Sequence, residues 1–370
     1  MTRRLLKIGF IGGGINSAVG QVHRSAVMMD GLYSIEGGVF SRNLDINRQS
    51  AIEYCFDEKR AYRSVDELLK KNTTLDLVAV LTPSPNHLEI ISMLNERDVS
   101  VICEKPLCSS LDDWSSINDI WNGNGKLFTV YNYTGYPMVR EARSIIETGT
   151  LGKVIQVIVE MPNEGMIRPP RIGGVPKPPQ AWRLKDSIIP HAALDLATHA
   201  IQLSRFIVQK ELAKAVGRFA NHSKFDNIKD TLQIIGELTN GASFSLWISK
   251  TALGCRNGLN IRIFCEKGSL HWAQKDPEHL NISDGSGMLT QFDRSNASGE
   301  GYHPRYDRFK VGHPAGFIEA FANYYRDIFE VLTDNHADKI NPFLFGLSDS
   351  YEELIVLETL VRKGRYERKV

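Results

Sequence analysis

The hydrophobic pattern of the first third of the chain alternates between short apolar runs and amphipathic segments. The apolar runs are rich in β-branched residues, which is typical of strands buried on both faces. The intervening segments space their apolar residues as helices do. Strands that alternate with helices in this way predict an α/β domain with a parallel, doubly wound sheet of the Rossmann type. The expected strands lie at 7–11, 33–40, 75–81, 99–103 and 126–131.

The pattern changes in the second part of the chain. Pro137 opens an amphipathic helix that ends before Gly149, a position where glycine commonly stops helices. Alternation of apolar and polar residues then recurs, and Asn240-Gly241 is a strong hairpin signal between two such segments. These features predict an α+β domain with a large, open, mostly antiparallel sheet. The expected elements are strands at 153–161, 216–220, 231–239, 242–250, 261–265 and 269–272, and helices at 138–148, 192–206 and 316–333.

Length and composition agree with two domains in a soluble globular protein. The chain has 370 residues, which is more than one hydrophobic core usually serves. Apolar residues make up 42% and charged residues 24%, as in globular proteins generally. The formal net charge of +1 contains no basic tail or acidic block, so we expect neither nucleic acid nor a membrane surface as partner. No apolar run approaches the roughly 20 residues of a membrane span.

The N-terminus and the cysteines favour a cytoplasmic protein. The apolar run after Arg3-Arg4 is too short for a signal peptide and is expected to be the first strand. The five cysteines form no close cluster of the kind that binds metals, so we expect no metal site. Free thiols in a reducing cytosol are the expected state.

A glycine-rich turn follows the first expected strand. Gly12 and Gly14 occupy the first two places of a G-x-G-x-x-G loop, in which backbone N–H groups approach a dinucleotide pyrophosphate at a helix N-terminus. Ser17 stands in the third place and Gly20 follows, so we expect a longer loop than usual. Glycine triplets also occur in ordinary turns, but a position between a strand and a helix at the start of the chain favours dinucleotide binding.

The second expected strand ends at Ser41 and Arg42, where dinucleotide-binding domains recognise the adenosine ribose. An acid at this point accepts hydrogen bonds from the ribose of NAD, whereas an arginine suits the 2′-phosphate of NADP. Residues 40–42 contain no acid, which favours NADP over NAD. Two alternatives stay open: Arg42 points to solvent, or Asp45 reaches the ribose or neutralises the arginine.

Polar residues also follow the third and fourth expected strands. Thr82-Pro83 and His87 come after the third, and Glu104-Lys105-Pro106 comes after the fourth. Ligands of open α/β sheets bind just past the carboxyl ends of the strands, so these residues are candidates for cofactor contacts. The alternative for Lys105 is a solvated side chain that merely flanks a strand.

A further polar pair lies in the expected helix at 192–206. Asp195, His199 and Gln202 fall at helical spacing beside a stripe of apolar residues, so Asp195 and His199 project together. The alternative is a solvated helix face that carries an ordinary Asp–His pair.

The order of the glycine-rich turn at 12–14, Thr82-Pro83 with His87, and Glu104-Lys105-Pro106 resembles the Gfo/Idh/MocA family, the glucose–fructose oxidoreductase and inositol dehydrogenase group of NAD(P)-dependent enzymes. The likeness covers essentially the whole chain. It implies an NAD(P)-binding Rossmann domain at 1–131 and a domain for substrate and oligomer contacts at 132–370.

In this family an Asp-x-x-x-His pair faces the nicotinamide opposite the lysine of the Glu-Lys-Pro motif. The resemblance therefore implies that Lys105, Asp195 and His199 are catalytic. The residues expected to bind the cofactor, NADP or NAD, are Gly12, Gly14, Ser17, Ser41, Arg42, Thr82, Pro83, His87, Glu104 and Lys105. The residues expected to bind the substrate are Tyr133, Tyr136, Arg183, Asp195 and His199, with Arg168 as a further possible donor.

Oxidation of a secondary alcohol requires a hydride acceptor, a base, and donors that hold the oxygen. His199 titrates nearest neutrality and is the natural acid/base, while Lys105 is suited to stabilise developing negative charge on the oxygen. Asp195 would orient His199 or bind an adjacent hydroxyl. Which of Lys105 and His199 takes the proton stays open.

The favoured interpretation is a dehydrogenase of a sugar, sugar derivative or inositol-like cyclitol, because 131–136 and 195–202 are rich in groups that bind hydroxyls. Two alternatives stay open. One is a reductase of a non-sugar compound, similar to dihydrodiol dehydrogenase or biliverdin reductase. The other is a non-catalytic NAD(P)-binding regulator, which would not need Lys105, Asp195 and His199 together.

Three further expectations concern loops and assembly. Residues 162–181 hold six of the fifteen prolines, so we expect a long irregular loop that lines the substrate cleft. Residues 274–313 are polar and show no pattern of regular structure. The alternating apolar face of 243–248 would need a cover, which predicts a homodimer or homotetramer formed through the second sheet.

Overall fold

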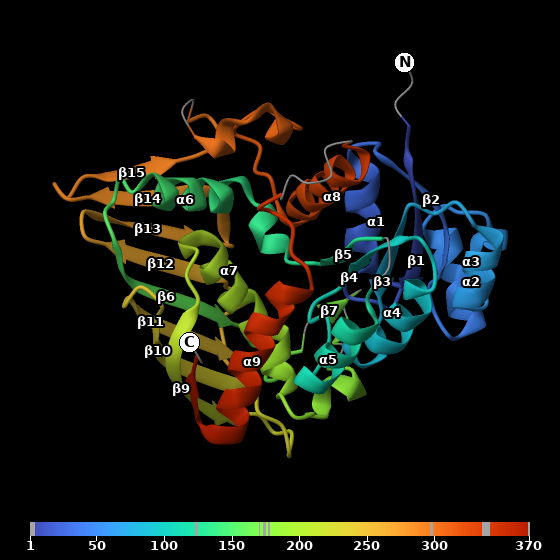
Figure 1. The fold of residues 1–370 in the computed structure, drawn as a ribbon, viewed down its shortest axis with the longest axis horizontal. Coiled ribbons are helices and arrows are strands. Elements are labelled where there is room, and N and C mark those ends of the chain that lie inside the picture. The colour runs from blue at the N-terminus through green and yellow to red at the C-terminus, as the bar shows by residue number, and fades with distance from the viewer. Residues whose placement is uncertain are drawn as a thin grey trace. The chain divides into compact units, whose positions relative to one another are not determined.

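The computed structural model describes residues 4–122, 125–169, 171–172, 175–176, 178–296, 299–334 and 341–368. It consists of two compact units (Figure 1). The first unit is formed by Met1–Gly135 and Phe317–Ser350, and the second by Tyr136–Gly316 and Tyr351–Val370.

The first unit contains a five-stranded parallel sheet with the strand order β2-β1-β3-β4-β5. The expected doubly wound α/β fold is therefore confirmed. Its strands are β1 (Leu6–Gly12), β2 (Tyr33–Val39), β3 (Leu77–Leu81), β4 (Ser100–Cys103) and β5 (Leu127–Thr129). Its connecting helices are α1 (Gly20–Met29), α2 (Leu44–Glu53), α3 (Val65–Lys71), α4 (His87–Asn95) and α5 (Leu111–Ile120).

Local sequence explains where these elements begin. All five residues of β3 are buried, as a continuous apolar run requires. Asn43 caps α2 by accepting hydrogen bonds from the backbone N–H groups of Asp45 and Ile46. Ser64 and Ser110 cap α3 and α5 in the same way. The starts of α2, α3 and α5 are thus encoded by short polar side chains directly before each of these helices.

Helix α8 (Phe317–Thr333) belongs to the first unit, although the sequence pattern placed it in the second domain. It packs against α1, and Asn323 donates a 2.8 Å hydrogen bond to the carbonyl of Gly135. The hydroxyl of Tyr324 donates to the carbonyl of Thr129 at the end of β5. An amphipathic pattern indicates that one face of a helix is buried, but not which element buries it.

The second unit contains a nine-stranded sheet in the order β15-β14-β13-β12-β6-β11-β10-β9-β16. Every neighbouring pair is antiparallel except β6 and β11, so the expected mostly antiparallel sheet is confirmed. Its strands are β6 (Val154–Pro162), β9 (Leu212–Ala220), β10 (Thr231–Leu238), β11 (Ser243–Ser249), β12 (Asn260–Cys265), β13 (Gly268–Ala273), β14 (Asp276–Asp284), β15 (Leu289–Phe292) and β16 (Arg365–Glu367).

Helices of the same unit cover one face of this sheet: α6 (Pro137–Thr148) and α7 (Thr198–Val208) lie across it (Figure 1). Phe244, Leu246 and Ile248 of β11 point to this face and are buried. The argument that this apolar face needs another subunit is therefore wrong. The sequence pattern did not predict helix α9 (Leu347–Lys363). Residues 347–350 of this helix belong to the first unit and residues 351–363 to the second.

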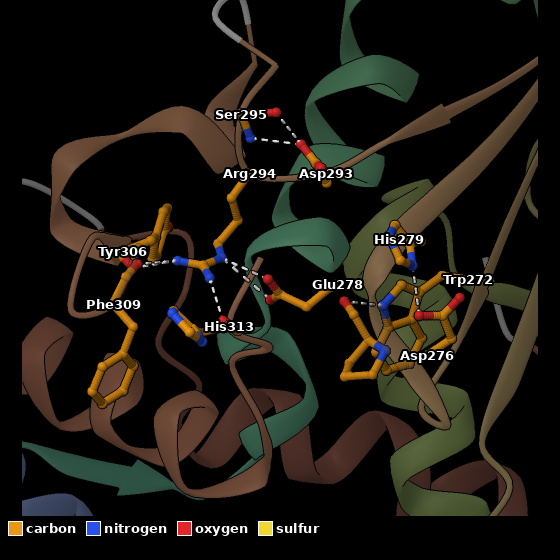
Figure 2. Close-up of polar contacts among 11 residues, drawn as sticks. Trp272, Asp276, Glu278, His279, Asp293, Arg294, Ser295, Tyr306, Phe309 and His313 are labelled. Carbon is orange, nitrogen blue, oxygen red and sulfur yellow. Dashed lines mark hydrogen bonds and ion pairs between the residues drawn. The ribbon is translucent and has the colours of Figure 1, made fainter. Parts of the chain in front are cut away.

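The polar stretch 274–313 is better ordered than its sequence pattern indicates. It forms β14 and β15, and it contains Arg294, which is only 1% exposed. The guanidinium of Arg294 donates to the Glu278 carboxylate at 2.9 Å and to the carbonyls of Tyr306 and His313 at 2.9 and 3.1 Å (Figure 2). The buried guanidinium of Arg294 thus links β14 to the segment that follows β15. These contacts are not visible in the periodicity of the sequence.

The proline-rich loop 162–181 also departs from expectation, because it includes a short antiparallel ribbon of β7 (Arg171–Ile172) and β8 (Val175–Pro176). Its first residues are anchored to the end of β11, where the N–H of Met166 donates to the carbonyl of Lys250 at 2.9 Å. The expectation for this loop extends to Pro170, Gly173, Gly174 and Lys177, which lie outside the described residues.

Candidate active site

The glycine-rich turn at the end of β1 can be formed only by glycine at several positions. Gly12 and Gly13 have φ angles of +81° and +74°, a region that other residues rarely adopt. A Cβ on Gly12 would lie 2.8 Å from the backbone of Leu81 and Thr82, and a Cβ on Gly20 would lie 1.8 Å from the carbonyl oxygen of Gly13. The glycine that allows close packing at the start of α1 is therefore Gly20, and the loop is longer than the usual spacing.

Neighbouring side chains hold this turn in place. The hydroxyl of Ser17 accepts hydrogen bonds from the N–H groups of Val19 and Gly20 at 3.3 and 3.2 Å. The hydroxyl of Tyr54 donates to the carbonyl of Gly13 at 2.7 Å, and burial raises the pKa of Tyr54 to about 12. No acidic residue occupies the first turn of α1. The turn therefore fits the pyrophosphate of a dinucleotide, which the N–H groups at the start of α1 would hold.

Arg42 lies beside the loop that follows β3. Its Nη2 donates to the side-chain oxygen of Asn86 at 3.2 Å, and the hydroxyl of Ser41 accepts from the N–H of Asn43 at 3.1 Å. Within the described ranges of the chain, Asp45 forms no ion pair with Arg42. The second alternative for Arg42, neutralisation by Asp45, therefore has no contact to support it.

His87 is buried at the start of α4, with backbone carbonyls within hydrogen-bonding distance of both ring nitrogens. Its Nε2 lies 2.9 Å from the carbonyl of Thr82, and its Nδ1 lies 3.1 and 3.0 Å from those of Pro106 and Leu107. Burial lowers the pKa of His87, and the bonds to the carbonyls act against that shift. His87 thus lies between the loop after β3, which contains Thr82-Pro83, and the loop after β4. Its contacts help to fix the backbone of both candidate cofactor loops.

Glu104 and Lys105 follow β4 directly. The Glu104 side chain is buried, and its Oε1 lies 2.8 Å from Nε2 of His23 on α1. Its Oε2 accepts the backbone N–H of Lys105 at 3.2 Å. The glutamate of the Glu-Lys-Pro motif therefore supports the backbone that carries Lys105, a contact that the sequence did not reveal.

In the second unit, Asp195 lies in a π-helical turn, Ala193–Ala197, that leads directly into α7. The sequence pattern predicted a continuous α-helix here. π-Turns inside helices are uncommon and occur frequently at functional sites. His199, the second residue of α7, is 8% exposed, and Gln202 is buried as well. The alternative of a solvated helix face therefore does not hold.

Two cations lie at the Asp195 carboxylate. Lys250, directly after β11, forms an ion pair with Oδ2 of Asp195, and Nη1 of Arg183 lies 3.5 Å from the same oxygen. Arg183 also contacts Nε2 of His191 at 3.1 Å and stacks on the ring of Trp182. The structure thus brings Asp195, Arg183 and Lys250 together.

Sequence reasoning missed Lys250, but a signal was present. The alternation of Phe244, Leu246 and Ile248 places residue 250 on the helix-covered face of the sheet. A lysine on such a face is 8% exposed here and needs a counter-charge, because a buried unpaired ammonium is costly.

The remaining predicted substrate residues are engaged in packing or ion pairs within their own units. Tyr133 is 5% exposed and packs near Phe317, and Tyr136 is 2% exposed and packs near Trp272. Arg168 forms a 2.5 Å ion pair with Glu164. Lys105 and Tyr133 belong to the first unit, whereas Tyr136, Arg183, Asp195 and His199 belong to the second, so their convergence stays a prediction.

The described part of the chain contains no group of three or more His, Cys, Asp or Glu side chains placed to hold a metal ion. Among the same residues, no helix is both long and apolar enough to span a bilayer.

Two family models match the chain. One, described as an oxidoreductase family with an NAD-binding Rossmann fold, covers residues 6–132, and the other, the GFO/IDH/MocA C-terminal domain, covers residues 139–271. The chain belongs to the Gfo/Idh/MocA family of oxidoreductases. The resemblance drawn from the glycine turn and the Glu-Lys-Pro motif is thereby confirmed, and so is a Rossmann domain of NAD-binding type.

Similar proteins cover most of the chain. An uncharacterised oxidoreductase of Bacillus subtilis is 27% identical over 86% of this chain and 84% of its own length. Levoglucosan dehydrogenase of Pseudarthrobacter phenanthrenivorans is 23% identical over 98% of this chain and 97% of its own. The crystal structure of an inositol dehydrogenase homologue from Azotobacter vinelandii, complexed with NADH and myo-inositol, superposes with a TM-score of 0.87 at 22% identity and covers 99% of this chain and 98% of its own. At 22% identity, the similarity to this crystal structure shows a common fold.

Proposed function

We propose that this Gfo/Idh/MocA oxidoreductase is an NAD(P)-dependent dehydrogenase that transfers a hydride between the nicotinamide and a secondary alcohol or ketone of a sugar, sugar derivative or cyclitol. The observation that carries the proposal is the carboxylate of Asp195, held by Lys250 and Arg183 four residues before a buried histidine on the same helical segment. Carboxylates and cations arranged in this way suit the hydroxyl groups of a polyol. The activities named for relatives such as levoglucosan dehydrogenase support the same substrate class.

The chemistry divides between the cofactor and the protein. When bound, the nicotinamide supplies the hydride acceptor. The turn at Gly12–Gly14 and the start of α1 would hold the pyrophosphate, and Ser41 with Arg42 would bind the adenosine ribose. Lys105 would donate a hydrogen bond to the substrate oxygen, and Asp195 would orient His199 or bind a neighbouring hydroxyl. Lys105 and His199 are the two groups suited to take the hydroxyl proton.

We infer a preference for NADP over NAD. The end of β2 presents the hydroxyl of Ser41 and the guanidinium of Arg42, and the nearest acid along the chain, Asp45, forms no ion pair with Arg42 among the described residues. A guanidinium without a neutralising carboxylate favours a 2′-phosphate over a bare ribose diol.

We also propose a cytoplasmic homodimer or homotetramer that assembles through the second sheet. The face of the sheet opposite α6 and α7 exposes Val216 and Ile235, which are 58% and 67% exposed and are paired across β9 and β10. Trp247 of β11 lies two positions along the same face. The five cysteines form no disulfide, which supports a reducing compartment.

The decisive experiment is a turnover assay with purified protein. Reduction of NADP⁺ and NAD⁺ is followed over a panel of monosaccharides, anhydrosugars, inositols and aromatic dihydrodiols. We expect turnover with a sugar or cyclitol, and a loss of roughly 100-fold or more in Lys105→Ala, because that variant loses the donor to the substrate oxygen. Lys71→Ala, at an exposed ion pair with Glu67, is the control and should retain activity.

Other outcomes separate the alternatives. Turnover confined to the dihydrodiols would favour a non-sugar reductase. Cofactor binding without turnover of any compound would favour a regulator and contradict the dehydrogenase proposal. Normal turnover in Lys105→Ala would remove that lysine from the chemistry.

A further inference from the structure

A buried chain of polar side chains connects α8 to the end of β4 within the first unit. Nδ1 of His23 lies 2.7 Å from the hydroxyl of Tyr325 on α8, and Nε2 of His23 lies 2.8 Å from Oε1 of Glu104. The other carboxylate oxygen of Glu104 accepts the backbone N–H of Lys105 at 3.2 Å. His23 is located on α1, three residues after Gly20 at its start. The helix that follows the glycine turn therefore also contacts the residue that supports Lys105.

With Glu104 as an ionised carboxylate and His23 as a neutral imidazole, the donor and acceptor roles along this chain are fixed. An ionised carboxylate only accepts hydrogen bonds, so Nε2 of His23 must donate to Glu104. In a neutral imidazole the other nitrogen then accepts, so the hydroxyl of Tyr325 must donate to Nδ1. Burial raises the pKa of Tyr325 well above its usual value, and the charge of Glu104 adds to that rise. The hydroxyl therefore keeps the proton that His23 requires.

Packing leaves no ready substitute for His23. The exposed fractions of His23, Glu104 and Tyr325 are 0%, 8% and 1%. The imidazole packs edge-on against the rings of Phe321 and Tyr325, with ring centroids 4.9 and 5.8 Å away. The hydroxyl of Tyr33 holds the backbone of Tyr325 through a 2.6 Å hydrogen bond to its carbonyl. Loss of the imidazole would leave the Glu104 carboxylate buried without this donor, and a buried acceptor that lacks its donor is destabilised by its desolvation.

We propose that His23 is a positioning residue for Lys105, acting through Glu104, and that it couples the start of α1 to the lysine. The inference rests on the proposed dehydrogenase function, in which Lys105 contacts the substrate oxygen. His23 and Tyr325 hold the carboxylate in one orientation, and the carboxylate holds the backbone N–H of Lys105. The lysine is then placed by the same helix whose N-terminus would bind the cofactor pyrophosphate.

The test is a pair of variants that keep one or the other nitrogen of the imidazole. In His23→Gln, the amide nitrogen takes the place of Nε2 and still donates to Glu104. In His23→Asn, the amide nitrogen takes the place of Nδ1 and does not reach Glu104. With a compound that the wild type turns over, we expect kcat to fall by about 10- to 100-fold in His23→Asn, since a small misplacement of a reacting group has effects of this size. His23→Gln should stay near the wild-type value.

Two further measurements distinguish positioning from a general structural role. The dissociation constant for NADPH, followed by its fluorescence, and the melting temperature should be similar in the two variants. In a Lys105→Ala background, His23→Asn should cause no further loss of kcat, because its effect passes through that lysine. Should His23→Asn not fold, Tyr325→Phe removes only the donor to Nδ1 and should lower kcat in the same direction by a smaller factor.

Equal losses of kcat and melting temperature in His23→Gln and His23→Asn would overturn the inference. So would independent, multiplicative losses for His23→Asn and Lys105→Ala, or unchanged kcat in His23→Asn. A wild type that turns over no compound of the panel would instead contradict the proposed function, and the inference that rests on it.

Discussion

At the scale of single residues, the candidate site depends on charged side chains that are largely buried and paired. Lys250 has 10% of its side chain exposed, and its partner Asp195 has 25%. Removing a charge from water costs several kcal/mol unless a partner compensates, so each of these residues offsets the desolvation cost of the other. Arg183, at 3.5 Å from the same oxygen, contributes less because it is further away and more exposed.

We therefore predict that Lys250→Met lowers kcat/KM by about 10- to 100-fold, because the Asp195 carboxylate loses its closest cation and its orientation. Stability to urea should fall by about 2 kcal/mol, since a partly buried carboxylate is left with fewer partners. Lys250→Arg keeps the charge and is the matched control, with smaller losses in both measurements. If Lys250→Met and Lys250→Arg behave alike, the charge of Lys250 has no part in orienting Asp195.

Arg42 permits a second residue-scale prediction. Charge-assisted contacts between a guanidinium and a phosphate are worth about 1.5–3 kcal/mol, or a factor of about 10 to 100 in affinity. Dissociation constants for NADPH and NADH should therefore differ in favour of NADPH, and Arg42→Ala should remove most of the difference. Arg48→Ala, on the following helix α2, is a control that should leave the ratio unchanged. Equal binding of both cofactors by the wild type would show that Arg42 does not recognise a phosphate.

At the scale of elements, two segments of the second unit differ from expectation. The segment expected to be one α-helix begins with the π-helical turn Ala193–Ala197, which carries Asp195. The loop 162–181, expected to be irregular throughout, is fastened at its start by Glu164. Oε2 of Glu164 accepts the N–H of Gly254 at 2.8 Å, and Oε1 pairs with Arg168.

The pH dependence of this loop follows from Glu164. The hydrogen bond from Gly254 and the bonds and charge of Arg168 lower the pKa of Glu164 below its ordinary value. A carboxyl with a lowered pKa stabilises the folded loop at pH values above its ordinary pKa, and the contribution is lost as the pH falls below about 4. We predict a lower protection factor for the Gly254 amide in Glu164→Gln at neutral pH, and a similar fall in the wild type on acidification, with each exchange rate compared with the intrinsic rate at that pH.

A control for this prediction is Arg256→Gln, because Arg256 is 77% exposed and lies 3.5 Å from Glu164. Its exchange at Gly254 should match the wild type at neutral pH. Unchanged protection of Gly254 in Glu164→Gln would mean that the backbone bond from Met166 to Lys250 fastens the loop by itself.

At the scale of the whole molecule, the two faces of the second sheet differ. The face that α6 and α7 cover is buried, while the opposite face carries exposed apolar residues at Val216 and Ile235 beside polar neighbours. Val216 and Ile235 lie side by side on adjacent strands, and an exposed apolar pair of this kind suits the centre of a symmetric interface. The proposed assembly therefore involves this open face rather than the apolar side of β11.

We predict that Ile235→Lys shifts the mass measured by sedimentation equilibrium toward that of one chain, because a charge in the centre of a sheet-face interface would be desolvated without a partner. Leu44→Lys is the control, since Leu44 is an exposed apolar residue of the first unit, 43% exposed on α2. A wild-type protein that is monomeric at micromolar concentration would contradict the proposed assembly.

The sequence by itself determined the features that depend on neighbouring residues. The parallel sheet, the strands of the second sheet up to β13, and helices α6 and α8 follow from periodicity, because burial of one face imposes a period of two on strands and 3.6 on helices. The glycine turn after β1 also follows, since positive φ angles at Gly12 and Gly13 exclude other residues. Candidate residues at strand ends follow from the general geometry of open α/β sheets.

Only the tertiary structure decided which distant residues meet. The pairing of Lys250 with Asp195, the contact of His23 with Glu104 and the anchoring of β14 by Arg294 join side chains that lie between 16 and 81 positions apart. The placement of α8 in the first unit has the same origin. Periodicity shows that a position is buried, but it does not show which residue it contacts, because that depends on how complete elements pack. A charge that this packing buries is stable only when an opposite charge or hydrogen-bond partner is packed beside it.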